Sequence, residues 1–221
     1  MIAEELIANT ITPLKVSDSI QKAEHRMAEF RVQHLPIVKK HQFIGLLSEE
    51  DIAQTTDYNV AVGTLNLSLI NPFVYEDQHI YEVIRVFFEQ KLSVLPVLNY
   101  EMDYLGLISQ QTLTGSFAKM FSVSEIGAII VLEVGNRDNS MSHIAQIVES
   151  NNAQILSSFV ESVPESTKLE VTLKLNKIEI SNIIASFLRY DYVVKATYNF
   201  LDRDNGARDR YDSLMNYLSF D

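Results

Sequence analysis

The sequence predicts an α+β protein with two β-α-β-β-α repeats, a ferredoxin-like β-α-β-β-α-β domain and a C-terminal helix. Three observations lead to this prediction. A segment of about sixty residues occurs twice, apolar runs alternate with helix-spaced apolar residues in each copy, and a second βαββαβ pattern follows. The predicted boundaries are 1–60 and 61–121 for the repeats, 122–201 for the third domain and 202–221 for a charged linker and amphipathic tail.

Each repeat opens with a short strand, at residues 14–16 and 73–75, and continues into a helix. Asp18 and Asp77 stand where a carboxylate would accept hydrogen bonds from the first helical amides, so we expect them to be N-caps. The apolar residues at helical spacing are Ile20, Ala23, Met27 and Phe30 in the first copy, and Ile80, Val83, Ile84, Phe87 and Phe88 in the second.

Two further strands follow in each repeat, at residues 35–38 and 43–47 and at residues 95–98 and 104–108. Their nearly continuous apolar runs are typical of strands that are covered on both faces. A sixty-residue unit is marginally stable alone, because a small domain buries too little surface. We therefore expect the two copies to share a buried face as one pseudo-two-fold module.

The second half alternates strands and helices in the order of a ferredoxin-like fold. The expected strands are residues 129–134, 153–160, 168–175 and 193–198, and the expected helices are a segment from Met141 and residues 180–188. Residues 193–198 are expected to form an open edge that could pair with another chain. In the tail, Tyr211, Leu214, Met215 and Leu218 lie at i, i+3, i+4 and i+7, which predicts an amphipathic helix.

Composition narrows the classes of function. Eighteen basic and 29 acidic residues give a net charge of −11, which opposes binding to nucleic acid or to an anionic membrane. The chain has no cysteine, and its five histidines show no metal-ligand spacing, so we predict neither a metal site nor a cofactor. It also has no G-x-S-x-G elbow and no glycine-rich phosphate loop, so we predict no catalytic residues and no enzyme. Without a signal peptide or spanning segment, a cytoplasmic location is expected.

The repeats resemble a tandem pair of CBS domains, the Bateman module. The resemblance rests on the proline-containing strands at residues 34–38 and 94–98 and on a Gly-x-x-Ser-x-x-Asp motif at Gly45, Ser48 and Asp51. It implies a regulatory adenosine ligand in a cleft between the copies. Asp51 would accept hydrogen bonds from the ribose hydroxyls, and Ser48 would cap the next helix and reach ribose or phosphate. The positions implied around the adenine are Thr12, Pro13, His34, Leu35 and Pro36.

Two readings of this motif remain open. Ser48 and Asp51 also form a good helix start, with serine at the N-cap and aspartate three residues later, and this needs no ligand. His34 is either a phosphate contact or an edge residue, and we favour the edge residue. Glu49 and Glu50 would repel a polyphosphate, so AMP, adenosine or S-adenosylmethionine is favoured over ATP. The second copy has threonine in place of the aspartate, and its degenerate site would comprise Val94, Pro96, Ser109 and Thr112.

The third domain resembles an ACT domain, a family that binds small effectors such as amino acids. The resemblance places a ligand loop at Asn136, Asp138, Asn139 and Met141, with asparagine where the family has glycine. Asp138 would hold an α-amino group, or would be an ordinary turn residue, which we favour. The layout of a CBS pair followed by an ACT-like domain is similar to that of the acetoin-utilisation regulatory proteins, and no acetoin role is inferred from it.

The sequence thus predicts a non-catalytic sensor that binds an adenosine-type ligand, takes an amino acid or small metabolite at the ACT-like domain, and signals to an unidentified target protein by a population shift. The alternative is a dimeric interaction scaffold whose ligand sites have degenerated. Under either hypothesis a homodimer is expected.

Overall fold

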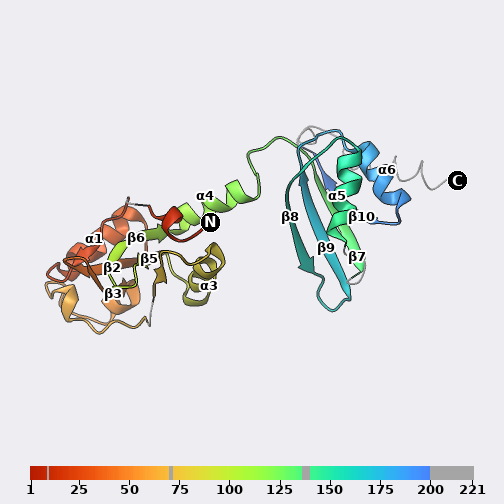
Figure 1. Cartoon of the computed structure of the whole chain (residues 1–221). Helices are drawn as coiled ribbons and strands as arrows, with labels where there is room; N and C mark the ends of the chain where they lie inside the picture. The colour runs from red at the N-terminus through yellow and green to blue at the C-terminus, as the bar shows by residue number, and fades with distance from the viewer. Residues whose placement is uncertain (9, 70–71, 136–139, 200–221) are drawn as a thin grey trace. The chain divides into compact units, whose positions relative to one another are not determined.

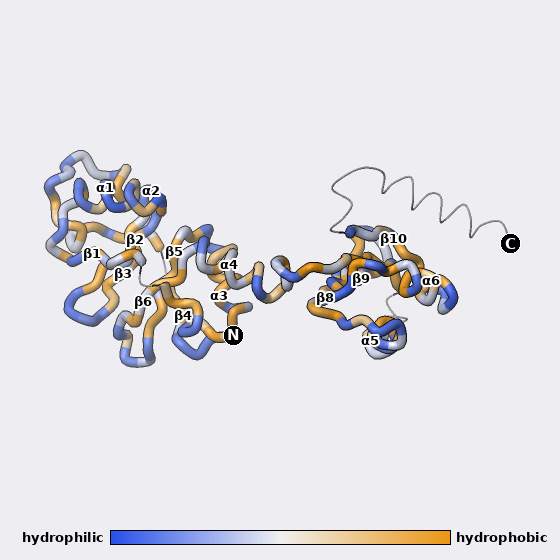
Figure 2. The backbone as a smooth tube through the Cα atoms, turned by 90° about the horizontal axis from the view of Figure 1, so that it is seen from above, coloured by the Kyte–Doolittle hydropathy of each residue, from blue (hydrophilic) through white to orange (hydrophobic). Residues whose placement is uncertain are grey.

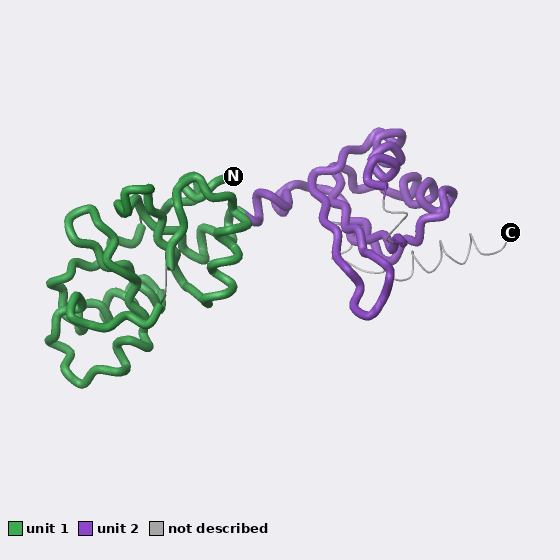
Figure 3. Tube along the Cα trace, turned by 60° about the horizontal axis from the view of Figure 1, so that its bottom comes forward, with its two compact units in different colours: residues 1–116 green, residues 117–221 purple. Residues whose placement is uncertain are grey.

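The computed structural model describes residues 1–8, 10–69, 72–135 and 140–199 of the 221-residue chain (Figure 1). The chain divides into two compact units, residues 1–116 and 117–221, which are coloured separately in Figure 3. In the described ranges, no helix has the length and apolar character needed to cross a bilayer. The predicted tail helix lies outside the described residues.

The first unit contains the two predicted β-α-β-β-α repeats. The first repeat comprises β1 (Leu14–Lys15), α1 (Ile20–Phe30), β2 (His34–Lys39), β3 (Gln42–Ser48) and α2 (Glu49–Ala53). The second comprises β4 (Val74–Tyr75), α3 (Ile80–Gln90), β5 (Val94–Leu98), β6 (Tyr104–Ser109) and α4 (Gln110–Met120), whose last residues belong to the second unit. Each repeat forms its own three-stranded sheet, in the order β1-β2-β3 or β4-β5-β6.

Strands β2 and β5 are the centre of this unit. Each is the middle strand of its sheet, parallel to the short first strand and antiparallel to the third. Residues 34–38 and 94–98 are all buried, which confirms the prediction of strands covered on both faces for β2 and β5. For β3 and β6 the prediction is wrong in the first half of each strand, where Ile44 and Leu105 are exposed. In Figure 2 the hydrophilic residues of the first unit lie mainly in its loops and helices, as expected when the strands supply the core.

The N-terminal segment packs on the second repeat, and the inter-repeat segment packs back on the first. A short 3-10 helix at Glu4–Leu6 follows Ala3, whose N–H donates to the Gln78 carbonyl at 2.9 Å in the second repeat. Conversely, Val62, at the start of a 3-10 helix, donates to the Asp18 carbonyl at 2.8 Å in the first repeat. The N-terminal segment thus completes the second repeat, and the segment between the repeats completes the first.

The predicted N-caps of the first helices are wrong by one or two residues. Ser19 caps α1 by accepting from the Lys22 N–H, and His79 caps α3 through its Nδ1 and the Tyr81 N–H. Asp18 instead accepts from the Lys15 N–H at 2.9 Å and from the Lys22 ammonium at 2.7 Å. A side chain just before a helix can bond to the preceding turn as well as to the first helical amides, and the sequence does not distinguish the two.

The second unit has the predicted β-α-β-β-α-β order. Its elements are β7 (Ile129–Gly135), α5 (Met141–Ser150), β8 (Ile155–Ser162), β9 (Lys168–Leu175), α6 (Ser181–Arg189) and β10 (Val193–Tyr198). The antiparallel sheet has the order β10-β7-β9-β8, which is the ferredoxin-like arrangement with β10 at one edge. Alternate residues of β7 and β9 are buried against the apolar faces of α5 and α6, which form one core with them.

Candidate functional site

A cavity of about 400 Å³ lies in the first unit and is lined by both repeats. The first repeat contributes the start of β2 and the start of α2. The second contributes the segment that enters it and the end of α3. The lining residues are Gln33, His34, Ser48, Glu49, Glu50, Ser68, Leu69, Gln90 and Lys91. We call this the first cavity. It contains two of the predicted positions, His34 and Ser48.

Ser48 and Asp51 form a capping box at the start of α2. This is the helix-start interpretation of the motif, which the sequence offered beside ribose binding. The Asp51 N–H donates to the Ser48 Oγ at 3.1 Å, and the Ser48 N–H donates to the Asp51 Oδ2 at 3.0 Å. The other carboxylate oxygen, Oδ1, accepts from the Ser68 N–H at 3.0 Å. Asp51 is only 4% exposed. It thus ties together two segments that line the cavity, Ser48 from the first repeat and Ser68 from the entry to the second.

His34 lines the first cavity and links the two repeats. Its Nδ1 accepts from the Ser93 N–H at 3.2 Å and lies 3.0 Å from the Ser93 Oγ, which in turn accepts from the Gln33 N–H at 2.9 Å. His34 lies on a central strand and is 8% exposed, so the favoured reading as an edge residue is wrong. Burial lowers the pKa of His34 below its ordinary 6.5, although the charges of Glu50 and Asp51 raise it.

A second cavity of about 460 Å³ repeats this construction with the two repeats exchanged. The second repeat contributes the segment around Ser93 and the start of α4, and the first contributes its entering segment and the end of α1. The lining residues are Thr10, Ile11, Glu29, Phe30, Arg31, Val32, Ser93, Ser109, Gln110 and Gln111. Of the predicted second-site residues, Ser109 lines this cavity.

Thr112 replaces the aspartate in the second repeat, and its hydroxyl contacts the Ser109 hydroxyl. The Thr112 N–H donates to the Ser109 Oγ at 3.1 Å, and the two hydroxyl oxygens lie 2.9 Å apart. The start of α4 therefore carries a neutral pair of hydroxyl groups, where the first repeat has a carboxylate that accepts from two backbone N–H groups.

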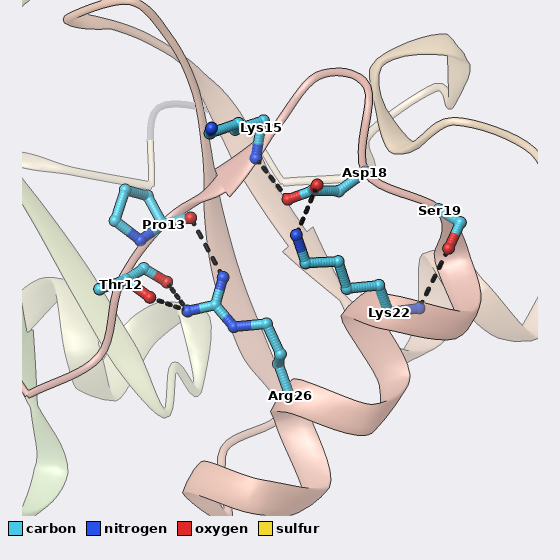
Figure 4. A network of polar contacts seen from close by, with 7 residues as sticks. All are labelled: Thr12, Pro13, Lys15, Asp18, Ser19, Lys22 and Arg26. Atoms are coloured by element: carbon cyan, nitrogen blue, oxygen red, sulfur yellow. Dashed lines mark hydrogen bonds and ion pairs between the residues drawn. The ribbon is translucent and has the colours of Figure 1, made fainter.

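Thr12 and Pro13 are occupied elsewhere in the first repeat. Figure 4 shows the Arg26 guanidinium against the carbonyls of Thr12 and Pro13 and the Thr12 hydroxyl, with the bond to the Pro13 oxygen at 3.2 Å. Neither residue is among the described residues that line the first cavity, because the entering segment of the first repeat faces the second cavity instead. The predicted strand positions Leu35, Pro36, Val94 and Pro96 are buried in β2 and β5 and line neither cavity.

Three lining residues are absent from the predicted sites: Ser68, Lys91 and Arg31. Lys91 and Arg31 hold the same position in the two repeats, immediately after the first helix, and both have left-handed backbone, with φ of 51° and 54°. A basic residue at this point in both copies was visible in the repeat alignment. That it faces the other repeat's helix start was not, because this depends on how the repeats pack.

The predicted ACT loop is only partly described. Met141 packs against the core of the second unit, while Asn136, Asp138 and Asn139 lie outside the described residues. A cavity of about 500 Å³ has Gly135 and Ser140, the two ends of this loop, in its lining. His143 also lines it, and its Nδ1 lies 3.0 Å from the Tyr192 hydroxyl. The described residues contain no group of three or more His, Cys, Asp or Glu that could hold a metal ion.

Comparisons with known proteins identify the first unit. Residues 3–56 and 68–119 match the family model of the CBS domain. A CBS domain pair/ACT domain protein from Thermotoga maritima is 22% identical, with a TM-score of 0.48 over 53% of this chain and 96% of that one. CBSX2 in complex with AMP is 18% identical, with a TM-score of 0.44 over 52% of this chain and 95% of that one. The CBS domain pair of protein MJ0100, in complex with 5-methylthioadenosine and S-adenosyl-L-methionine, is 18% identical, with a TM-score of 0.42 over 53% and 96%. The N-terminal part of the chain is therefore a tandem pair of CBS domains.

Proposed function

We propose that the CBS pair binds an adenosine compound with few phosphates in the first cavity, and that the protein is a regulatory sensor without catalysis of its own. The observation that carries the proposal is the construction of this cavity. Its volume of about 400 Å³ lies in the range of small-molecule sites, about 300–1,000 Å³, and both repeats line it. A ligand that contacts both repeats can favour one arrangement of them over another, which is what a sensor requires.

The polar groups of the first cavity suit a nucleoside better than a polyphosphate. Ser48 and Ser68 offer hydroxyl groups, and Gln33 offers a carboxamide, all of which can pair with ribose or adenine. Asp51 is not itself among the described lining residues, but it accepts from the backbone N–H groups of Ser48 and Ser68 and so positions both at the cavity. Glu49 and Glu50 stand beside Ser48, so a chain of phosphates would meet two carboxylates there.

The wider proposal includes the second unit and a partner. We propose that this unit is an ACT-like domain that takes an amino acid or small metabolite at the cavity lined by Gly135, Ser140 and His143, and that the protein acts on a separate target in the cytoplasm. The supporting observations are the ferredoxin-like sheet order and the cavity at the ends of the predicted loop. A dimeric scaffold with degenerate sites is the second candidate, and Thr112 in place of aspartate favours it.

Thermal unfolding with adenosine, AMP, S-adenosylmethionine and amino acids separates these candidates. A ligand at 100 times its Kd should stabilise the protein by about 2.7 kcal/mol. We expect adenosine to stabilise the wild type but not Ser68→Trp, in which an indole fills the first cavity from an exposed position. Asn66→Trp, two residues earlier and equally exposed, is the matched control and should respond like the wild type. If no adenosine compound stabilises the wild type, the sensor proposal fails and the dimeric scaffold becomes the favoured function.

A further inference from the structure

The sheet of the second unit has one face that the described residues cover only in part. Helices α5 and α6 pack on the face that carries the buried residues of β7 and β9. A cavity of about 190 Å³, which we call the sheet cavity, is lined by strand residues that alternate with those buried ones and so lie on the opposite face. Its lining residues are Phe121, Val123, Ile129, Ser157, Phe159, Thr172 and Lys174.

The sheet cavity is built mainly from apolar side chains that stay accessible to water. Phe121, from the segment after α4, packs edge-on against Phe159, with ring centroids 5.7 Å apart. The Phe121 carbonyl accepts from the Ser157 hydroxyl at 3.0 Å, which fixes this segment on the sheet. Phe121, Val123 and Phe159 nevertheless remain 37%, 66% and 41% exposed. A group of exposed apolar side chains around a hollow is typical of a surface that receives another segment.

The C-terminal tail begins beside this cavity. Tyr198, the last residue of β10, pairs with Ile129 of β7. Across the next two strands, Ile129 pairs with Lys174, and Lys174 pairs with Ser157. These four residues form one row across the sheet, about 14 Å wide at about 4.8 Å per strand spacing. The last three of them line the sheet cavity, so the chain leaves the sheet one strand away from it.

The tail has the length and the sequence pattern to cover this surface. Residues 200–210 can span about 35 Å when extended, at about 3.3 Å per residue, which is more than twice the width of the row. The helix predicted for residues 211–218 would be about 12 Å long, at 1.5 Å per residue, and so matches that width. Its apolar stripe comprises Tyr211, Leu214, Met215 and Leu218.

Charge and polarity favour the sheet cavity over the helical side of the unit. Lys174 is the one charged residue among the described residues that line the cavity. Residues 211–221 carry the carboxylates of Asp212 and Asp221 and no lysine or arginine. On the other side of the unit, the outer faces of α5 and α6 expose polar residues such as Gln146 and Asn182, which offer nothing to an apolar stripe.

From these observations we infer that the C-terminal tail docks its apolar stripe on the sheet cavity of its own chain. The docked tail closes this face of the sheet to other proteins, and its release opens the face. The inference concerns a surface of the second unit and does not depend on any ligand site proposed above.

A single tryptophan in the sheet cavity tests the docking in the full chain. The protein has no tryptophan, so Phe159→Trp introduces the only indole. Leu214→Glu with Leu218→Glu should release the tail and shift the emission to longer wavelength, because the indole then faces water. Ser213→Glu with Asn216→Glu adds the same charge on the side of the predicted helix opposite the stripe, and it should leave the emission unchanged. Emission that responds to neither pair, or equally to both, would overturn the inference.

A disulfide test distinguishes docking within one chain from docking on a second copy. The protein has no cysteine, so Thr172→Cys with Met215→Cys carries the only pair of thiols. Under mild oxidation by diamide, we expect these thiols to form a disulfide that keeps the mass of one chain on a denaturing, non-reducing gel. Gln146→Cys with Met215→Cys is the control, because residue 146 is exposed on the outer face of α5, and it should stay reduced.

Three results of the disulfide test would overturn the inference. A disulfide that joins two chains would show that the tail covers a second copy. Equal oxidation of the two pairs would show that the tail has no preferred site. A Thr172→Cys pair that stays reduced would show that the tail does not reach the sheet cavity.

Discussion

At the scale of single residues, Asp51 connects the two repeats of the first unit through its buried carboxylate. It is buried, and its two oxygens accept from two backbone N–H groups that belong to different parts of the chain. The motif that suggests ribose binding therefore has a structural role that is fulfilled without ligand. Asp51 also holds Ser48 and Ser68 in place at the first cavity. A substitution at this position therefore changes stability as well as ligand binding, and stability is measured first.

Asp51→Ala should reduce the free energy of unfolding by about 1–3 kcal/mol, because buried N–H groups lose their acceptor. Asp51→Asn should cost less, since its amide oxygen can still accept from one of the two backbone N–H groups. Urea denaturation of the three proteins checks the order. Equal losses in the two variants would contradict the capping role assigned to this position.

His34 predicts a pH dependence of stability. Its pKa is lowered in the folded protein, mainly by burial, so the unfolded chain takes up this proton at higher pH than the folded one. Its contribution to stability is complete above the unfolded value of 6.5 and is lost as pH falls below it, by up to about 1.4 kcal/mol per pH unit.

Chemical denaturation between pH 7.5 and 5 compares the wild type with His34→Asn, whose amide oxygen can accept from the Ser93 N–H without titrating. The wild type should lose more stability than the variant as pH falls. Parallel curves for the two proteins would show that the folded state does not disfavour the charged imidazole.

At the scale of elements, the segment between the repeats is part of the fold of the first repeat. Gly63 donates its N–H to the Val16 carbonyl at 3.0 Å, and a Cβ on Gly63 would lie 2.8 Å from that oxygen and 2.9 Å from the Val16 Cβ. The segment and the first strand therefore approach as backbones, which leaves no room for a side chain.

Gly63→Ala should destabilise the first unit, because backbone must shift to admit the methyl group. Gly115→Ala is the matched control, since a Cβ there has nothing within 4 Å and alanine favours a helix interior by about 0.5–1 kcal/mol. Thermal unfolding should give shifts of opposite sign. A neutral or stabilising Gly63→Ala would contradict the packing of this segment.

Local pattern predicted the elements well and their partners poorly. The apolar run at residues 94–98 identifies a buried strand, because burial on both faces leaves its mark on every residue. The cap of α1 could not be assigned between Asp18 and Ser19, since both offer oxygens at the same turn. Thr12 was predicted to share a ligand site with Ser48. The packing of the repeats instead brings the segment before each repeat's first strand to the start of the other repeat's second helix.

At the scale of the whole molecule, the expectation of a homodimer still awaits a test. Among the described residues β10 is an edge strand of its sheet, and such an edge is a natural site of pairing. Light scattering at micromolar concentration should give twice the 25.2 kDa of one chain. A mass of one chain would remove the dimer from both candidate functions.

The central claim is that the first cavity of the CBS pair receives an adenosine compound, and a crystal structure grown with adenosine tests it most directly. We predict density for one nucleoside in the first cavity, with its ribose near Ser48 and Asp51 and the ligand in contact with Ser68 of the second repeat. Adenosine bound outside this cavity, or a first cavity that stays open to solvent at a saturating concentration, would contradict the account.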